Sequence, residues 1–162
     1  MIISNSSTLI LLAKVSVLQR FLDEYKRVVI PAQVFEEMIV ESDALDSLLI
    51  KKEVKNGRIE TKDVNKTDRI LEEFRLHRGE AATYALFQEL KGDVILTDDG
   101  ELIKLCKITG VPFVCAMAVV VRMFKKKLLS KNEACDYLEK LFDYGRYSGQ
   151  VYKFYKDEVS CR

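Results

Sequence analysis

Two adjacent carboxylates, Asp98 and Asp99, follow a run of apolar residues at Val94–Leu96. Consecutive apolar positions rich in β-branched residues indicate a buried strand, and the apolar residues from Leu102 to Ile108 recur at the spacing of a helix. The two acids therefore lie between a predicted strand and the helix that follows it. In an open parallel sheet, the carboxyl ends of the strands form the edge where ligands bind. The pair is therefore a candidate site for chemistry.

Three more polar side chains, from distant parts of the chain, are expected at the same edge. Asn5 follows the first predicted strand, Glu37 lies on a helix that begins near residue 31, and Glu80 opens a later helix. Clustered carboxylates without histidine or thiolate are the ligands that Mg²⁺ or Mn²⁺ prefers. Like charges packed together are otherwise costly. The pattern therefore predicts a Mg²⁺ or Mn²⁺ site, with these side chains and the Asp98–Asp99 pair as ligands.

Each acid also has a structural alternative. In the first turn of a helix, Glu80 would be stabilised by the helix dipole by about 0.3–1 kcal/mol without any function. Asp98, with Glu101 three positions later, fits a capping box. Asp99 is then the carboxylate without a routine structural role, while Glu37 could be solvated on a helix surface.

Strand and helix patterns alternate along the chain. The predicted strands are Met1–Ser4, Val28–Ile30, Ile59–Thr61, Val94–Leu96 and Pro112–Cys115. The predicted helices are Thr8–Lys14, Val17–Tyr25, a helix from Pro31, a helix or helical turn over Leu45–Ile50, a short one over Ile70–Phe74, one from Glu80 to Leu90, one over Leu102–Ile108, Ala116–Phe124, Asn132–Phe142 and Val151–Val159. In the segment Ala116–Phe124, the β-branched residues favour a strand, but the alternation of strands and helices along the chain favours a helix. The alternation predicts an α/β fold of three layers, α/β/α, with a central parallel sheet of four or five strands.

Length and composition favour one globular domain over residues 1–162, with C-terminal helices from about residue 131. The net charge of +1 neither favours nor excludes a nucleic-acid partner, so that case depends on local basic clusters. The chain opens without a basic segment or cleavage site, and its longest apolar stretch, Val111–Val121, is too short to span a bilayer. A cytoplasmic protein with no membrane partner is expected.

The four cysteines show no metal-type spacing: Cys106, Cys115, Cys135 and Cys161. Because cytosolic disulfides are rare, they are predicted to be reduced structural thiols. His77 is the only histidine, which argues against a histidine-based zinc site, and it is expected in a solvated loop. Glycine-rich phosphate-binding motifs are absent, which argues against a nucleotide-binding domain.

Four segments, in order along the chain, carry a family resemblance. Met1–Ile10 is similar to an opening strand followed by Asp and then Ser/Thr, and Pro31–Glu37 matches a Pro-x-x-Val-x-x-Glu segment. Gly79–Ala82 matches a Gly-Glu-Ala helix start, and Leu96–Leu102 matches a Thr-x-Asp motif. In this order the chain resembles a PIN-domain protein, of the metal-dependent ribonuclease-like family that includes many prokaryotic toxin nucleases. The tail, including Gly145–Ser148, also resembles the family.

The resemblance implies that Glu37, Glu80 and Asp99 are catalytic acids that bind the metal, with Asp98 beside them. The first acid of the family, an Asp, is Asn5 here. The amide keeps a carbonyl oxygen but loses a negative charge, which weakens a cation site. Three interpretations stay open: little or no nuclease activity, compensation by Asp98, or a substitution introduced to suppress activity. Asn5 could also simply cap the first helix, as could its neighbours at positions 6 and 7.

The activity that the resemblance implies is Mg²⁺- or Mn²⁺-dependent endoribonuclease cleavage of RNA phosphodiester bonds. The alternative is a catalytically inactive PIN-fold module for RNA binding or protein interaction. Ser7 and Thr97 are expected next to the ligands; Ser7 would either hydrogen-bond a ligand carboxylate or cap a helix.

Contacts with RNA phosphates require cations. The candidates are Arg75 and Arg78, which lie just before Glu80, and Arg122 with Lys125. Four tyrosines near the C-terminus, at positions 144, 147, 152 and 155, could stack on bases, but packing or a dimer surface is favoured. The expected partners are RNA, an antitoxin-like protein and a second copy of the chain.

Overall fold

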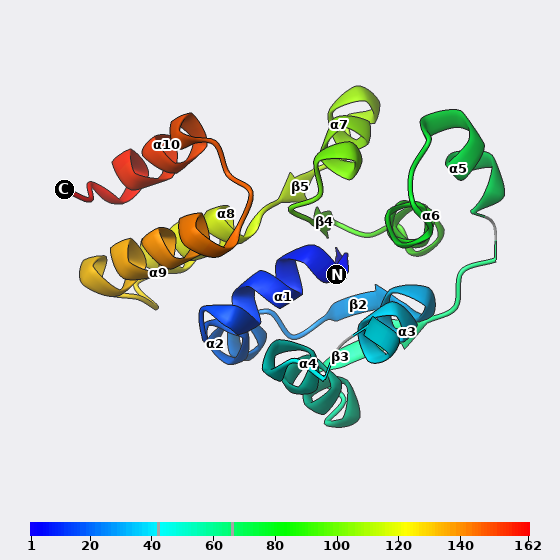
Figure 1. The fold of residues 1–162 in the computed structure, drawn as a ribbon, viewed down its shortest axis with the longest axis horizontal. Coiled ribbons are helices and arrows are strands. Elements are labelled where there is room, and N and C mark those ends of the chain that lie inside the picture. Colours follow the sequence, from blue (N-terminus) through cyan, green and yellow to red (C-terminus); the bar gives the residue numbers. More distant parts are fainter. Residues whose placement is uncertain (42, 66) are drawn as a thin grey trace.

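The computed structural model describes residues 1–41, 43–65 and 67–162. Its five strands form one parallel sheet in the order β3-β2-β1-β4-β5 (Figure 1). They are β1 (Ile2–Ser4), β2 (Val28–Pro31), β3 (Ile59–Lys62), β4 (Val94–Leu96) and β5 (Phe113–Val114). Helices cover both faces of the sheet, which confirms the predicted three-layer α/β/α architecture.

The helices follow the predicted alternation. They are α1 (Ser6–Lys14), α2 (Leu18–Glu24), α3 (Ala32–Glu41), α4 (Leu45–Lys55), α5 (Asp68–Phe74), α6 (Arg78–Leu90), α7 (Gly100–Thr109), α8 (Ala116–Lys125), α9 (Lys131–Tyr144) and α10 (Gly149–Val159). The ambiguous segment after β5 is helical, as predicted. Figure 1 shows α8, α9 and α10 gathered at one end of the molecule, away from α5 and α6. Among the described helices, none is long and apolar enough to cross a membrane.

Most predicted helix starts differ by one or two residues from those of the structure, and two of these differences concern Pro31 and Glu80. Pro31 ends β2, paired with Lys62 of β3, and α3 begins at the next residue. Because a proline has no backbone N–H to donate, it fits the end of a strand directly before a helix better than a helix interior. Helix α6 begins at Arg78 rather than Glu80, because His77 takes the extended N-cap position. Glu80 is therefore inside the first helical turn.

Strand β1 is the centre of the sheet, hydrogen-bonded to β2 on one side and β4 on the other. Strands β2 and β3 follow one another on one side of β1, whereas β4 and β5 lie on its other side. The direction in which strands are added therefore reverses between β1 and β4. Such a switch point is where open α/β sheets bind ligands. Ser4 pairs with Leu96, and the backbone N–H of Asn5 donates to the Leu96 carbonyl at 2.9 Å. Asn5 and Thr97 therefore leave the sheet side by side.

Alternating strand residues fill the apolar cores on the two faces of the sheet. Ile3 and Val29 pack with apolar residues of α6 on one face. Ile30 and Leu96 pack on the other face, in a larger cluster with residues of α1, α2, α8 and α9. Both faces of the central strands are thus covered, which fixes where the loops after β1 and β4 emerge.

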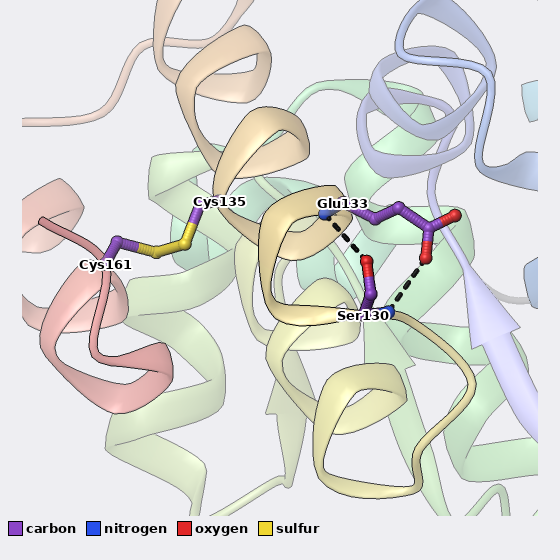
Figure 2. Close-up of a disulfide and its surroundings, with 4 residues drawn as sticks. All are labelled: Ser130, Glu133, Cys135 and Cys161. Carbon is purple, nitrogen blue, oxygen red and sulfur yellow. Dashed lines mark hydrogen bonds between the residues drawn. A yellow bond between two sulfur atoms is a disulfide. The ribbon is translucent and has the colours of Figure 1, made fainter.

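A disulfide joins α9 to the residues after α10. Cys135 and Cys161 are bonded, with Cα atoms 5.8 Å apart (Figure 2). The prediction of four reduced thiols is therefore wrong for this pair, whereas Cys106 and Cys115 are free and buried. The two bonded residues are 26 positions apart and meet only because α9 and α10 pack as a hairpin, so their spacing carries no signal. Figure 2 also shows the capping box of Ser130 and Glu133 that starts α9.

Reducing this disulfide is expected to lower the free energy of unfolding by about 3.5 kcal/mol, because the bond closes a loop of 26 residues in the unfolded chain. Denaturant unfolding with and without a dithiol reductant measures the change. The matched control is the double variant Cys135→Ser/Cys161→Ser, which should unfold at the same midpoint in both conditions. An equal shift in the double variant would mean that the reductant acts elsewhere.

Candidate active site

Glu37 of α3 lies against the first turn of α6. A Cβ atom built on Gly79 would be only 2.9 Å from Glu37 Oε2. Any side chain at position 79 would therefore displace the Glu37 carboxylate, or be displaced by it. Glycine at this position lets the carboxylate approach the backbone this closely. The contact places the Glu37 carboxylate next to the residue that precedes Glu80.

Glu80 is half-buried, and its Oε2 atom is buried without a hydrogen-bond partner among the described residues. Burial is the main cause that raises the pKa of the Glu80 carboxyl, and the negative charge of Asp99 raises it further. The Glu80 and Asp99 side chains therefore lie close enough to repel each other. A buried carboxylate oxygen without a donor, beside a second carboxylate, is costly unless a cation or a proton joins them.

Asp99 is the N-cap of α7. Its Oδ1 atom accepts from the backbone N–H of Leu102 at 2.8 Å, and its own N–H donates to Thr97 Oγ1 at 3.1 Å. The expectation that Asp98 caps this helix, with Asp99 left free of structural work, is wrong. Asp99 directly precedes the first helical residue, so its side chain is the one that reaches the free N–H groups. Glu101 pairs with Lys104 instead of closing a capping box.

Asp98 is turned toward other elements. Its Oδ2 atom accepts from Thr8 Oγ1 at 2.6 Å and from the Ala116 N–H at 2.9 Å, while its Oδ1 atom accepts from the Tyr147 hydroxyl. Burial raises the pKa of the Asp98 carboxyl, and these three hydrogen bonds oppose the rise. With both oxygens engaged by protein donors, Asp98 braces the structure. The interpretation in which it replaces the missing charge at position 5 loses its support.

The two residues expected beside the ligands act on the backbone. Ser7 Oγ accepts from the backbone N–H of Asp98 at 3.1 Å, and the N-cap of α1 is Asn5, so the expectation that Ser7 caps this helix is wrong. Thr97 is fully buried, and its hydroxyl holds the N–H of Asp99. Together they fix the path of the chain through the two adjacent acids.

Asn5 is the N-cap of α1, one of the three candidates for that position. Its Oδ1 atom accepts from the Ser6 N–H at 2.8 Å, and only 3% of the residue is exposed. The oxygen that would face a cation is thus already engaged by the helix start. The strand register places it beside Thr97, at the same switch point as the acids.

The donor chemistry of this edge fits a hard divalent cation. Asn5, Glu37, Glu80 and Asp99 offer only oxygen, and Glu80 Oε2 has no hydrogen-bond donor within the described part of the chain. Among the residues that the structure describes, however, no group of three or more His, Cys, Asp or Glu side chains forms a ready-made metal cluster. The structure therefore brings suitable donors to one edge without closing them into a cage.

The basic candidates differ in their surroundings. Arg78 is the exposed first residue of α6, and Arg75 is exposed in a left-handed backbone conformation (φ 53°) three residues earlier. Lys125 of α8 forms an ion pair with Glu158 of α10, which offsets its charge, while Arg122 is exposed on the same helix. His77 is exposed, as predicted for a solvated residue.

A family model described as a PIN domain matches residues 1–159. The chain belongs to the PIN-domain family. PIN domains are in general nuclease-like and depend on divalent metal ions. Comparison with curated proteins gives no match, and comparison with solved structures gives none.

Sequence patterns did not indicate which residues of this PIN domain contact Asp98. Thr8 and Tyr147 both donate to Asp98, and neither spacing nor residue type indicates that contact. Of the C-terminal tyrosines, those at positions 147, 152 and 155 pack against the larger core, as favoured, and Tyr152 stacks on Phe142 with ring centroids 4.4 Å apart.

Replacing Glu80 by Gln is expected to stabilise the metal-free protein at neutral pH. The raised pKa means that the folded state holds the Glu80 proton more tightly than the unfolded state does. The protonated Glu80 carboxyl therefore stabilises the folded state relative to the unfolded state. This contribution is fully present below the ordinary pKa of 4.5 and is lost as the pH rises through the higher pKa of the folded state. Glu80→Gln should therefore unfold at a higher denaturant concentration than the unmodified protein at pH 7, and the gap should shrink toward pH 4.

The matched control is Glu89→Gln, an exposed position on the same helix. This variant should change the denaturant midpoint neither at pH 7 nor at pH 4. A metal-free Glu80→Gln protein less stable than the parent at pH 7 would contradict the electrostatic assignment.

Proposed function

We propose that this PIN domain is a Mg²⁺- or Mn²⁺-dependent endoribonuclease that hydrolyses RNA phosphodiester bonds. Glu37, Glu80 and Asp99 are the proposed catalytic acids and metal ligands. The observation that carries the proposal is the approach of Glu80 to Asp99 at the switch point between β1 and β4, where one buried oxygen of Glu80 has no donor among residues 1–41, 43–65 and 67–162. Membership of a nuclease-like family supports the same reaction class.

The protein's own contribution is to hold oxygen donors in place. Asp99 is oriented by its cap on α7 and by Thr97, while Gly79 lets the Glu37 carboxylate reach the start of α6. Glu80 presents its unpaired oxygen from the first turn of the same helix. Divalent ions bound there would lower the pKa of a water molecule and neutralise charge on the phosphate. No side chain need then act as a general base.

Asn5 sets the level of activity in this proposal. It offers a neutral oxygen in place of a carboxylate, and that oxygen already accepts from the Ser6 N–H. Because Asp98 is engaged by three donors of its own, it does not restore the missing charge. We therefore propose an attenuated nuclease. An inactive PIN-fold module that binds RNA or another protein is the alternative outcome of the test below.

RNA would approach along α6. The exposed guanidinium groups of Arg75 and Arg78 precede Glu80 on this path, so phosphates drawn to them lie near the acids. Lys125 is proposed as a weaker contact, since Glu158 offsets its charge, and Arg122 is proposed as a further contact, exposed on the same helix.

The proposed biological setting is a toxin-like protein with an antitoxin-like partner, in the cytoplasm, with a homodimer as the other assembly. Support comes from apolar residues that α9 and α10 leave exposed: Phe142, Tyr144, Val151 and Phe154. The cytoplasmic location remains a prediction. The disulfide Cys135–Cys161 is the feature that is unusual for that compartment.

Asn5→Asp is expected to raise Mg²⁺-dependent RNA cleavage and Mn²⁺ affinity. Even partners outside the ligand shell change metal affinity by about 10–100-fold, so a restored ligand charge should change it at least as much. Calorimetry with Mn²⁺ and cleavage of a fluorescent single-stranded RNA measure the two effects. Glu80→Gln and Asp99→Asn, each added to Asn5→Asp, should abolish both.

Three results would separate the alternatives. Cleavage that survives a chelator would overturn metal dependence. RNA binding without cleavage in either form of position 5 would favour the inactive module. Unchanged Mn²⁺ binding in Glu80→Gln and Asp99→Asn would remove the acids from the site.

Arg78→Ala is expected to weaken RNA binding and reduce its salt dependence. One lost phosphate contact lowers the slope of log affinity against log salt by about 0.7 for a single strand. Lys125→Ala should lower it less, because Lys125 is paired with Glu158. Fluorescence anisotropy over a salt series gives both slopes. Equal slopes in the two variants would contradict an approach along α6.

A further inference from the structure

A hydrogen-bonded cluster surrounds Asp98, the neighbour of the proposed ligand Asp99. Its donors come from three elements far apart in the sequence: Thr8 of α1, the Ala116 N–H at the start of α8, and Tyr147 between α9 and α10. Thr8 is fully buried. The cluster therefore ties the C-terminal helices to the loop that carries Asp99.

The Tyr147 ring packs directly against the backbone of Gly145. A Cβ atom built on Gly145 would overlap the ring of Tyr147 and come within 2.8 Å of the Leu141 carbonyl. Gly145 has an extended backbone (φ −92°, ψ 175°), which any residue adopts, so glycine is required for space and not for conformation. Ser148 then caps α10, with its Oγ 3.2 Å from the Val151 N–H. The segment that carries Tyr147 is thus held on both sides.

With its ring in this position, the hydroxyl of Tyr147 is linked by hydrogen bonds to the segment that carries Asp99. It donates to Asp98 Oδ1, while the Asp98 N–H donates to Ser7 Oγ. The next N–H, that of Asp99, donates to Thr97. Of the three donors to the Asp98 carboxylate, Tyr147 is the one that reaches Oδ1. Without it, that oxygen would be left without a donor and the side chain would have to turn.

We propose that Tyr147 is a positioning residue of the active site, which fixes the Asp98 side chain and, through it, the direction of the Asp99 carboxylate. This inference rests on the proposed function, because it takes Asp99 as a site residue. Tyr147 itself touches neither substrate nor metal. The C-terminal helix pair is in this view part of the catalytic scaffold.

Tyr155 provides a matched control on the same helix pair. Its hydroxyl lies 3.3 Å from Cys115 Sγ and makes no hydrogen bond to Asp98. Tyr155→Phe removes one partly buried hydroxyl from the same region, as Tyr147→Phe does, but leaves the Asp98 cluster complete.

The decisive test is amide hydrogen exchange by NMR on the metal-free protein, which needs no catalytic activity. Tyr147→Phe should speed exchange at the N–H groups of Asp98, Asp99 and Leu102 by about tenfold, the effect of losing one hydrogen bond to a charged group. Tyr155→Phe should leave these three rates unchanged. Unchanged rates in Tyr147→Phe, or equal acceleration in both variants, would overturn the proposal.

Gly145→Ala keeps the hydroxyl but displaces the ring, so it should accelerate the same three amides. Unchanged exchange in this variant would also overturn the proposal, even if Tyr147→Phe fails to fold.

Kinetics on the Asn5→Asp background separate positioning from general structure. Tyr147→Phe should lower kcat about tenfold with KM for RNA unchanged, since binding along α6 is untouched. A rise in KM alone would overturn the positioning role. If no variant cleaves RNA, the proposed nuclease function fails, while the exchange rates still decide whether Tyr147 fixes the loop.

Discussion

The pairing of β1 with β4 is the constraint on which the site depends. These strands are separated by about ninety positions in the chain, yet Ser4 and Leu96 are register partners. The residues after them, Asn5 and Thr97, consequently emerge together where the order of strands reverses. Both faces of the two strands are buried, so a shift in register would cost core packing. Every other site residue is placed relative to this junction.

Asp98 and Asp99 show how one peptide step separates two roles. The first carboxylate is directed toward Thr8, Ala116 and Tyr147, and each of its oxygens accepts from at least one protein donor. The second caps α7 with one oxygen and lies near Glu80. A pair of identical residues thus divides between holding the scaffold together and facing another acid.

Much of the fold was predictable from sequence because apolar periodicity reports burial directly. The five strands, the alternation with helices and the edge that gathers Asn5, Glu80 and Asp99 all follow from that pattern. The helix that contains consecutive valines after β5 was decided correctly by its neighbours rather than by propensity.

The misses share a physical cause. Which of Asp98 and Asp99 caps α7 depends on side-chain direction, and spacing rules do not resolve two adjacent acids. The bond between Cys135 and Cys161 depends on how two helices pack. The contact of Tyr147 with Asp98 depends on the space that Gly145 leaves for the tyrosine ring. Such contacts between distant segments leave no local mark in a single sequence.

The disulfide also makes residues 135–161 a covalent ring that encloses the turn between α9 and α10. Arg146 is exposed in that turn. A protease that cuts after Arg146 would open the backbone, yet both pieces would remain one molecule until the sulfur bridge is reduced. Helix α10 is therefore attached to the protein twice, once through the peptide chain and once through sulfur.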